Sequence, residues 1–377
     1  MILFRADANS NIGLGHIMRC LSIADALSSI TTEPTIVRGK DSIKFVLADE
    51  TVSELIKSRG YEPIVLHTDY NAMDGEIDAW EELSSSIDAD LIIVDSYFVT
   101  SSYLSWLKDN FGRVAYIDDV LSFAYPADIV VNYNAYASEA DYQRLYCGSS
   151  EPEFLLGVEY APLRSMFQNI PAREQKKNVW DILLSTGGSD ELHIAINFLR
   201  YLQQHDAGGK DEDGERGLTY HLLIGAMNTD KDEIRSLANT MPNVVIHENV
   251  ADMKRLICSM DVIISAAGST LYEVCACGVP LIAFISADNQ IPGAKAFEQL
   301  GLAVNVGDLR ESSSIDPKAV ISGTLSSDAV ERIMEAVEDL DEDTRISMVR
   351  HQRETIDGMG AKRLSERLIE KEEIRTI

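Results

Sequence analysis

Basic residues are scarce in this chain of 377 residues, which has 33 Lys and Arg against 61 Asp and Glu and a net charge of −28. A field of that sign repels the phosphate backbone of nucleic acids and the surface of anionic membranes. We therefore expect neither as a partner. An anionic small ligand would have to be held by local donors, such as the N–H groups at a helix N-terminus.

Uninterrupted apolar helical segments are also missing. The stretch from Val262 to Ile285 is long enough to span a membrane and contains only one charge, Glu273. However, Gly268-Ser269-Thr270 and Gly278-Val279-Pro280 divide it into strand, turn, helix, turn and strand, which a single spanning helix does not tolerate. We therefore expect no membrane insertion, and we expect the helix to begin at Ser269 or Thr270.

The first residues, MILFRADA, lack the basic start and apolar core of a secretory signal and resemble a strand instead. Cysteines are few and odd in number, and most lie in apolar segments: Cys20, Cys147, Cys258, Cys275 and Cys277. That pattern is typical of reduced thiols in a protein core. We therefore expect a cytoplasmic protein with neither a disulfide nor a cysteine metal site.

Short apolar runs alternate with helical patterns in two series, from Ile2 to Val131 and from Trp180 to Val306. Such alternation favours parallel, doubly wound sheets. The sequence therefore predicts an α/β protein with two Rossmann-like domains, residues 1–166 and 167–377. The segment from Asp328 onward has a helical pattern and is free to pack back across the first domain.

A glycine-rich turn, Ile12-Gly13-Leu14-Gly15-His16, follows the first predicted strand and precedes a helix. His16 therefore lies near a helix N-terminus at the carboxyl end of a sheet, where open α/β proteins bind ligands. The helix dipole favours a neutral imidazole that can accept a proton, and the alternative is a histidine that only caps the helix or packs in the loop. Met18 replaces the third glycine of G-x-G-x-x-G, so a nicotinamide site is not expected.

Polar residues also follow other predicted strands. Gly187-Gly188-Ser189-Asp190 can bring the backbone close to a ligand or simply cap the next helix. Asp288-Asn289-Gln290 carries amides suited to sugar hydroxyls, or forms an ordinary polar turn. Asp95-Ser96-Tyr97 closes a strand at the same end of the first sheet as His16, which favours a place in the lining of the site.

Two acidic pairs are candidates for a metal site. Asp88 and Asp90 have the D-x-D form but precede their strand, at the wrong end of a parallel sheet. Asp118-Asp119 follows a strand, but no companion His or Glu lies nearby in sequence, which favours a structural or sugar-contacting pair. We therefore expect no metal and no other cofactor.

Several of these motifs resemble a known family. Arg5-Ala6-Asp7, the turn that ends at His16, Arg19-Cys20 and the segment from Gly157 to Arg164 are similar to the nucleotide-sugar hydrolase of pseudaminic acid biosynthesis and its spore-coat polysaccharide relatives. The resemblance continues through 187–190, 265–280 and 288–290. The segment around Glu273 is less specific, because it also resembles the wider GT-B glycosyltransferases.

The resemblance implies a GT-B fold, with two Rossmann-like domains facing a central cleft and the nucleotide on the C-terminal one. It implies metal-independent, inverting hydrolysis of UDP-2,4-diacetamido-2,4,6-trideoxy-β-L-altropyranose or a close analogue, with release of UDP. His16 would activate the attacking water. The sugar would contact Arg5, Asp7, Gly15, Asp95, Tyr97, Asn289 and Gln290. The nucleotide would contact Gly187, Gly188, Gly268, Ser269, Thr270 and Glu273.

Two departures from the family pattern bear on the identity of the sugar. The segment from Tyr116 to Asn134 lacks a basic residue expected between the acidic pair and Asp128, and Glu191 stands where the family often has proline. Two other functions stay open. One is a GT-B glycosyltransferase that passes the sugar to a hydroxyl acceptor, and the other is a nucleotide-sugar binding module in which His16 is idle. The sequence indicates no particular oligomeric state.

Overall fold

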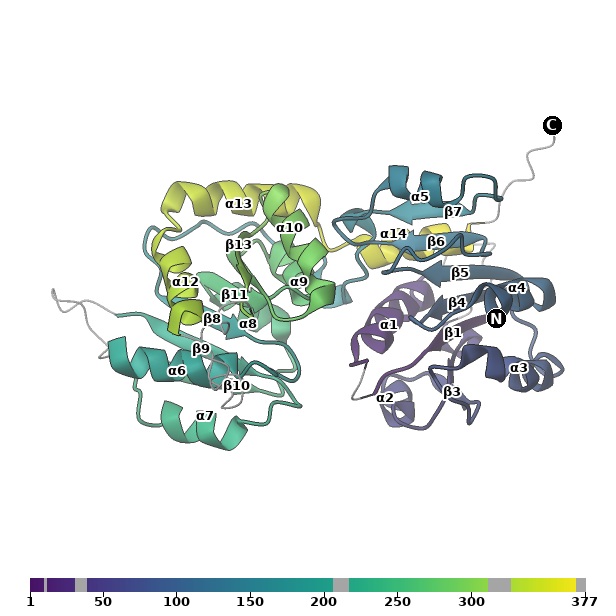
Figure 1. The fold of residues 1–377 in the computed structure, drawn as a ribbon, viewed down its shortest axis with the longest axis horizontal. Helices are drawn as coiled ribbons and strands as arrows, with labels where there is room; N and C mark the ends of the chain where they lie inside the picture. Colours follow the sequence, from purple (N-terminus) through teal and green to yellow (C-terminus); the bar gives the residue numbers. More distant parts are fainter. Residues whose placement is uncertain (10–11, 31–38, 206–216, 311–326, 371–377) are drawn as a thin grey trace. The chain divides into compact units, whose positions relative to one another are not determined.

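The computed structural model describes residues 1–9, 12–30, 39–205, 217–310 and 327–370 (Figure 1). The chain forms two compact units. Unit 1 runs from Met1 to Gln168 and resumes at Gly358, and unit 2 runs from Asn169 to Asp357. The sequence analysis put the division after residue 166 and allowed the C-terminal helices to pack back on the first domain. The contacts assign the last described helix to unit 1.

Unit 1 is built on a sheet of seven parallel strands in the order β3-β2-β1-β4-β5-β6-β7. The central strands are almost wholly apolar and buried at every position, as expected of strands covered on both faces. The strands are β1 (Ile2–Ala6), β2 (Ile43–Leu47), β3 (Glu62–Val65), β4 (Leu91–Asp95), β5 (Arg113–Ile117), β6 (Ile129–Asn132) and β7 (Glu153–Leu156).

Helices cover both faces of this sheet: α1 (Gly15–Ser28), α2 (Ser53–Ser58), α3 (Ile77–Ser84), α4 (Ser101–Asn110), α5 (Glu139–Leu145) and α14 (Gly360–Ile369). Within unit 1, α14 lies beside α1 although more than 300 residues separate them (Figure 1). Leu364 and Leu368 of α14 are buried, and Ser365 Oγ donates to the main-chain oxygen of Ile23 at 3.3 Å. The last described helix is therefore an integral part of the first unit.

Unit 2 has a six-stranded parallel sheet in the order β10-β9-β8-β11-β12-β13. Its strands are β8 (Asp181–Ser185), β9 (Thr219–Ile224), β10 (Val244–Glu248), β11 (Val262–Ala266), β12 (Leu281–Ile285) and β13 (Val304–Asp308). Its helices are α6 (Ile194–His205), α7 (Lys231–Ala238), α8 (Met253–Ser259), α9 (Thr270–Cys277), α10 (Ile291–Gln299), α12 (Ser327–Glu338) and α13 (Glu342–Thr355). Both sheets are parallel and flanked by helices, which confirms the predicted α/β fold class.

The apolar stretch from Val262 to Ile285 forms β11, α9 and β12, and α9 begins at Thr270 as predicted. Gly278 ends that helix in the left-handed conformation (φ 65°), which glycine adopts without strain. Of the helices in the described part of the chain, none combines the length and the apolar character needed to span a membrane.

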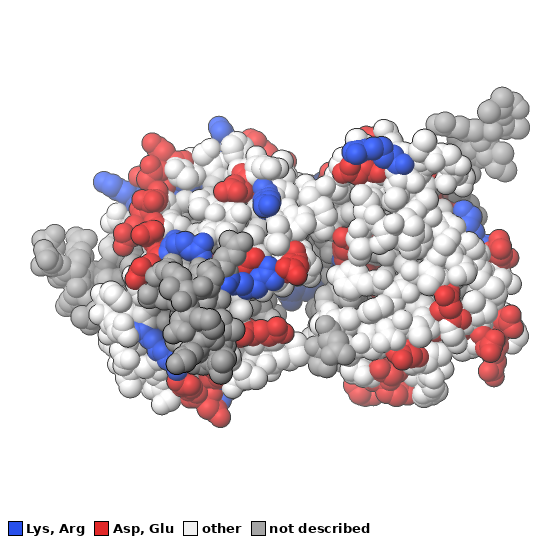
Figure 2. All heavy atoms as spheres, in the orientation of Figure 1, with Lys and Arg blue, Asp and Glu red and all other residues white. Residues whose placement is uncertain are grey.

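Acidic side chains outnumber basic ones on the face shown in Figure 2. Some carboxylates are held in surface ion pairs, such as Glu248 with Arg235 at 2.6 Å. Exposed pairs of this kind contribute little to stability, with a typical value of about 0–1 kcal/mol. The excess negative charge therefore bears on what the protein attracts or repels more than on its folding.

Each sheet has a point where the chain reverses its direction of travel across the strands. In unit 1 this point lies between β1 and β4, and in unit 2 it lies between β8 and β11. Open α/β sheets bind their ligands beyond the carboxyl ends of the strands at such a point. The loops that follow these four strands are therefore where a functional site is expected.

Candidate active site

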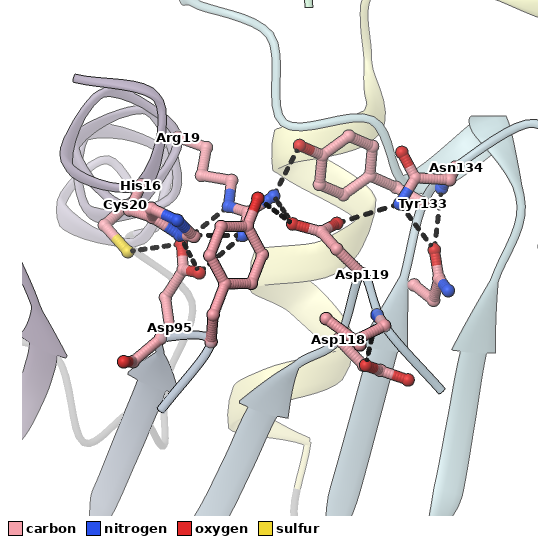
Figure 3. Close-up of polar contacts among 12 residues, drawn as sticks. His16, Arg19, Cys20, Asp95, Asp118, Asp119, Tyr133 and Asn134 are labelled. Carbon is pink, nitrogen blue, oxygen red and sulfur yellow. Dashed lines mark hydrogen bonds and ion pairs between the residues drawn. The ribbon is translucent and has the colours of Figure 1, made fainter. Parts of the chain in front are cut away.

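His16 lies at the switch point of unit 1 and is almost completely buried, with 4% of its surface exposed. It is the second residue of α1, as the sequence analysis predicted. Its Nδ1 lies 2.6 Å from Oδ1 of Asp95, the last residue of β4 (Figure 3). Two adjacent strand ends therefore bring together a histidine and a carboxylate that are 79 positions apart.

Asp95 fixes the tautomer of the imidazole. Burial on its own would raise the pKa of Asp95, but the Arg19 guanidinium and His16 together lower it well below its usual value. Asp95 is therefore a carboxylate and can only accept hydrogen bonds. Nδ1 of His16 lies 2.6 Å from Oδ1 of Asp95 and 3.0 Å from Nη2 of Arg19, which can only donate. The shorter contact, with an acceptor-only carboxylate, favours the proton on Nδ1. In the neutral ring Nε2 then keeps its lone pair, and it has no hydrogen-bond partner among the described residues.

Arg19 links this pair to a second carboxylate. It lies one turn after His16 on α1, and its Nε donates to Oδ2 of Asp95 at 2.6 Å. Its Nη1 lies 2.7 Å from Oδ2 of Asp119 and donates to the Tyr133 hydroxyl at 2.9 Å (Figure 3). The Arg19 guanidinium thus links residues at the ends of β4, β5 and β6, close to His16.

The two residues of the acidic pair after β5, Asp118 and Asp119, have different roles. Asp118 is fully buried and accepts from the main-chain N of Val120 at 2.8 Å and from the hydroxyls of Tyr125 and Tyr142 at 2.9 and 2.5 Å. It is therefore structural. Asp119 contacts Arg19 and accepts from Nδ2 of Asn134 at 2.8 Å, so it belongs to the cluster around His16.

Tyr97 forms the exposed side of this cluster. Its ring meets the His16 ring edge-on, with centroids 4.5 Å apart, and 44% of its surface is exposed. Its hydroxyl donates to Oδ2 of Asp119 at 3.4 Å. Gly15, the first residue of α1, is also exposed, and nothing lies within 4 Å of the position of a Cβ there. Both residues are therefore exposed beside the buried His16.

Arg5 has a different place from the one that the sequence analysis gave it. It is completely buried, with its guanidinium paired to Glu76 and to Asp7. It has no surface with which to touch a sugar, because a central strand of the sheet carries it inward. Asp7 is 8% exposed, and its Oδ1 accepts from the main-chain N of Ala48 at 2.8 Å. Arg5 therefore serves to hold Asp7 and the end of β1.

Unit 2 contains a pocket of about 540 Å³ at its own switch point. The lining comes from the turns after β8, β9, β10, β11 and β12 and includes Gly187, Gly188, Gly268, Ser269 and Thr270. The first N–H groups of a helix have no partner within it, so the start of α9 presents donors and a positive dipole end to this pocket. The Oγ1 of Thr186, another lining residue, is buried and has no hydrogen-bond partner among the residues that the structure describes.

The shape of the pocket lining depends on a glycine in the left-handed conformation and on one close backbone approach. Gly187 has φ 87°, in the left-handed region that side chains rarely adopt. A Cβ on Gly225, after β9, would lie 2.3 Å from the carbonyl oxygens of both Gly187 and Gly188. Only glycine fits there, so the turns after β8 and β9 pack directly against each other.

Asp190 lines the same pocket and caps α6, accepting from the main-chain N of Ile194 at 2.9 Å and of Ala195 at 3.0 Å. Burial raises the pKa of Asp190 to about 6 against the effect of those two hydrogen bonds. The sequence analysis left open whether this turn caps a helix or lines a ligand site. Asp190 caps α6, and it also lines the pocket.

Of the remaining candidates in unit 2, one lines the pocket and two lie outside its lining. Gln290 lines it, with its side-chain oxygen accepting from the main-chain N of Ser286 at 2.8 Å. Asn289 is exposed and lies outside the lining. Glu273 is on α9, three residues after Thr270, half-buried and also outside the lining. In the described residues, no group of three or more His, Cys, Asp or Glu side chains is placed to hold a metal ion.

Arg19, Asp119, Tyr133 and Thr186 are the main site residues that the sequence analysis gave no definite role. Arg19 is three positions after His16, and this helical spacing alone places both on one face of α1. Tyr133 directly follows β6, and Asp95 is the last residue of β4. Its position at a strand end could therefore have marked Tyr133 as a site candidate, as it did Asp95. Gly225 carries no such signal, because its role depends on a contact with a distant turn.

Comparison with known proteins finds similarity to a glycosyltransferase domain and to proteins of polysaccharide and pseudaminic acid biosynthesis. The model of the glycosyltransferase family 28 C-terminal domain matches residues 182–325. An uncharacterised protein of Methanocaldococcus jannaschii is 24% identical over 285 residues, 73% of this chain, and the match spans about half of that protein's length (54%). UDP-2,4-diacetamido-2,4,6-trideoxy-beta-L-altropyranose hydrolase of Campylobacter jejuni is 23% identical over 67% of this chain and 80% of its own.

The spore coat polysaccharide biosynthesis protein SpsG of Bacillus subtilis is 22% identical over 80% of this chain and 82% of its own. Among solved structures, MurG of Acinetobacter baumannii has a TM-score of 0.64 at 13% identity and covers 97% of this chain and 98% of its own. At that identity the likeness shows the fold. Together these matches show that the chain is similar, at low identity, to the pseudaminic acid UDP-sugar hydrolases and SpsG, and that its fold is like that of MurG.

Proposed function

We propose that the protein is a glycosyltransferase-like enzyme that hydrolyses a UDP-activated sugar and releases UDP. The proposed substrate is UDP-2,4-diacetamido-2,4,6-trideoxy-β-L-altropyranose or a close analogue, in the biosynthesis of a nonulosonic acid or surface polysaccharide. The observation that carries the proposal is the His16–Asp95 pair at 2.6 Å, which leaves Nε2 of a buried imidazole able to accept a proton. The name of the Campylobacter jejuni relative supports it.

The nucleotide half of the proposal lies in unit 2. The start of α9, with Gly268, Ser269 and Thr270, would bind the diphosphate through main-chain N–H groups, as helix N-termini commonly do. The unpartnered Thr186 hydroxyl and the Gln290 amide supply further donors in the same pocket. Glu273 would accept from the ribose hydroxyls, although this role requires its side chain to reach the pocket edge.

The water-activating half lies in unit 1. Nε2 of His16 would take a proton from a water molecule as the water oxygen bonds to the anomeric carbon. The bond from that carbon to the phosphate oxygen breaks on the opposite face, and its electron pair leaves with UDP. Asp95 would stabilise the imidazolium through the Nδ1–H bond, as a buried carboxylate does in other histidine-based sites. The helix end in unit 2 would absorb the charge of the leaving group.

Arg19 would act on this step as a positioning residue, because it keeps Asp95 ionised and aligned without reaching the reacting atoms. Asp7, Asp119 and Tyr97 would contact the sugar hydroxyl and amide groups. The structure gives no reason to include Arg5 among these contacts, and its proposed role is to hold Asp7.

Incubation of the purified protein with candidate UDP-sugars, without any acceptor, tests the proposal. We expect stoichiometric release of UDP and free sugar, with inversion at the anomeric carbon visible by proton NMR early in the reaction. UDP release that appears only when a hydroxyl acceptor is added would favour the alternative, a GT-B glycosyltransferase. The match of 182–325 to a glycosyltransferase domain is the observation that supports this alternative. UDP binding without turnover under either condition would leave a binding module.

A further inference from the structure

Three polar side chains lie together on the sheet of unit 2, outside the residues that line its pocket: Asp181 of β8, His221 of β9 and His247 of β10. In the register of the sheet, His221 pairs with Leu183 on one side and with Val245 on the other. Asp181 and His247 are each two residues from these partners, so all three side chains project from the same face. The proposed hydrolysis uses none of them.

The two imidazoles share a short contact between ring nitrogens. Nδ1 of His221 lies 2.8 Å from Nε2 of His247, and the ring planes are within 18° of each other. On the other side of its ring, Nε2 of His221 lies 3.2 Å from Oδ1 of Asp181. A carboxylate only accepts, which places the proton of His221 on Nε2 and leaves a lone pair on Nδ1. His247 therefore donates its own Nε2 proton to that lone pair.

The separation of these two nitrogens is that of two ligands on one metal ion. Zinc lies about 2.0–2.1 Å from a histidine nitrogen, and two such ligands at an angle of about 90–110° are about 2.8–3.4 Å apart. The nitrogens of His221 and His247, at 2.8 Å, lie within that range. An ion can therefore replace the shared proton with an adjustment of ring orientation and without any movement of the two strands.

Asp181 supplies the outer contact that histidine ligands usually have. A histidine that binds a metal generally donates its other ring N–H to a carboxylate, which fixes the ring and makes the ligand nitrogen more basic. Asp181 belongs to β8, an interior strand of the sheet, and its main-chain N donates to Oδ2 of Asp261 at 3.1 Å. The side chains of His221 and Asp181 are 13% and 15% exposed, so the pair is shielded yet open to a small ion.

We propose that His221 and His247 form a two-histidine site for a divalent transition metal ion such as Zn²⁺. The ion binds Nδ1 of His221 and Nε2 of His247, and the proton that His247 carried on Nε2 moves to Nδ1 of the same ring. Among the described residues, no group of three or more His, Cys, Asp or Glu is placed to hold a metal ion, so water completes the coordination. Imidazole ligands select zinc, copper or nickel over magnesium and calcium.

The ion would join the edge strand of the sheet to its neighbour. β10 pairs only with β9, and the turn that follows it carries Asn249 and Val250 into the lining of the pocket. An ion that binds the folded chain better than the unfolded one raises the stability of unit 2 by mass action. The ion takes no part in the proposed hydrolysis, so the site stands whether or not that function is correct.

The test is calorimetric titration of the full-length protein with Zn²⁺ after chelator has been removed. His247→Gln keeps a donor toward His221 but removes one ligand, and it should abolish a binding event that the unchanged protein shows. Asp181→Asn should weaken that event by about 10–100-fold, the usual effect of losing an outer contact. His205→Gln, a change of an exposed histidine on α6, is the matched control and should bind Zn²⁺ as the unchanged protein does. Mg²⁺ should give no such event.

A second measurement needs no variant and decides the matter even if His247→Gln fails to fold. Brief treatment of the unchanged protein with Cu²⁺ and ascorbate oxidises the histidines that hold the copper, and mass spectrometry of the peptides should find 2-oxo-histidine at His221 or His247. Oxidation confined to other histidines would overturn the site. Absence of Zn²⁺ binding by the unchanged protein, or equal Zn²⁺ binding by a folded His247→Gln protein, would overturn it as well.

Discussion

His16 illustrates how one side chain acquires a chemical role from two neighbours. The N-terminus of α1 disfavours a positive charge on the imidazole, whereas the Asp95 carboxylate at 2.6 Å favours it. The role of base proposed for His16 requires a ring that is neutral before the reaction and charged during it. Arg19 weakens the effect of Asp95 on a charged imidazole, because its guanidinium binds the same carboxylate.

We predict that His16→Asn lowers kcat by roughly 10²–10⁴-fold, the usual contribution of a positioned general base. UDP affinity should hardly change, because the proposed nucleotide site belongs to unit 2. Steady-state kinetics and UDP calorimetry on the same preparation measure both. A wild-type rate in a folded His16→Asn protein would move the role of base to Asp7 or Asp95.

The raised pKa of Asp190 leads us to predict that UDP binding depends on pH. Its folded-state pKa of about 6 lies above the ordinary aspartate value, so the carboxyl is neutral below about pH 6 and anionic above it. An anion in the pocket repels a diphosphate, so UDP affinity should fall as pH rises from 5 to 7.5. We expect about fivefold of that fall, roughly 1 kcal/mol, to come from Asp190.

Calorimetry of Asp190→Asn at the same pH values isolates this part, because the phosphates of UDP titrate equally in both proteins. Asparagine keeps one acceptor for the cap of α6. A pH dependence identical in the two proteins would show that Asp190 keeps its charge away from the nucleotide.

At the scale of elements, the sites are made by the turns that follow parallel strands. The turns after β8 and β9 touch at Gly225, where a Cβ would meet two carbonyl oxygens at 2.3 Å. Such contacts join segments that are far apart in sequence and set the shape of the pocket.

We predict that Gly225→Ala weakens UDP binding by about 1–3 kcal/mol, the usual cost of overpacking, because the Gly187–Gly188 turn must shift. Gly293→Ala is the matched control. Gly293 lies in α10, and nothing lies within 4 Å of its Cβ position, so this change should leave UDP binding as it is. Equal UDP affinities in the two variants, measured by calorimetry, would argue against a nucleotide in this pocket.

The helix α9 carries a second prediction. If the Glu273 carboxylate accepts from the ribose hydroxyls, Glu273→Gln should weaken UDP binding by about 1–3 kcal/mol, the range for hydrogen bonds to charged groups. Glu298→Gln, an exposed change on α10, serves as the control. Unchanged UDP affinity in folded Glu273→Gln would discard the ribose role, and the position of Glu273 outside the pocket lining makes this test especially informative.

Most of the strands could be predicted from the sequence, because buried parallel strands are continuous apolar runs. The strand β7 was missed, since Glu153–Leu156 is short and begins with a charged residue, as befits an edge strand paired only with β6. His16 and Asp95 could be predicted as members of a site from their places at strand ends. Their direct contact could not, because strand order decides which ends are neighbours, and strand order is a property of the whole sheet.

Arg5 shows the opposite case. It belongs to a motif shared with the family, yet its side chain points into unit 1 and pairs with Glu76. A charged residue in a strand of alternating orientation can serve either side of the sheet. The sequence motif alone does not distinguish a ligand contact from a buried ion pair, and only the burial of the side chain does.

At the scale of the whole molecule, the net charge of −28 and the proposed anionic substrate require compensation by local donors. We predict that turnover survives EDTA, because helix N–H groups and hydroxyls in the unit 2 pocket are proposed to absorb the phosphate charge. UDP release with and without chelator measures this. Loss of activity that Mg²⁺ or Mn²⁺ restores would instead indicate a metal-dependent mechanism and redirect attention to Asp119.

The return of α14 to unit 1 also sets the order in which the molecule can be completed during synthesis. Unit 2 is one continuous segment, so all of it can emerge from the ribosome and fold while α1 still lacks its neighbour. The unit that begins the chain is therefore the second to be finished. Until then the apolar surface of α1 that α14 covers is open to chaperones, and the unit that contains His16 is completed only after the unit that contains the glycine-lined pocket.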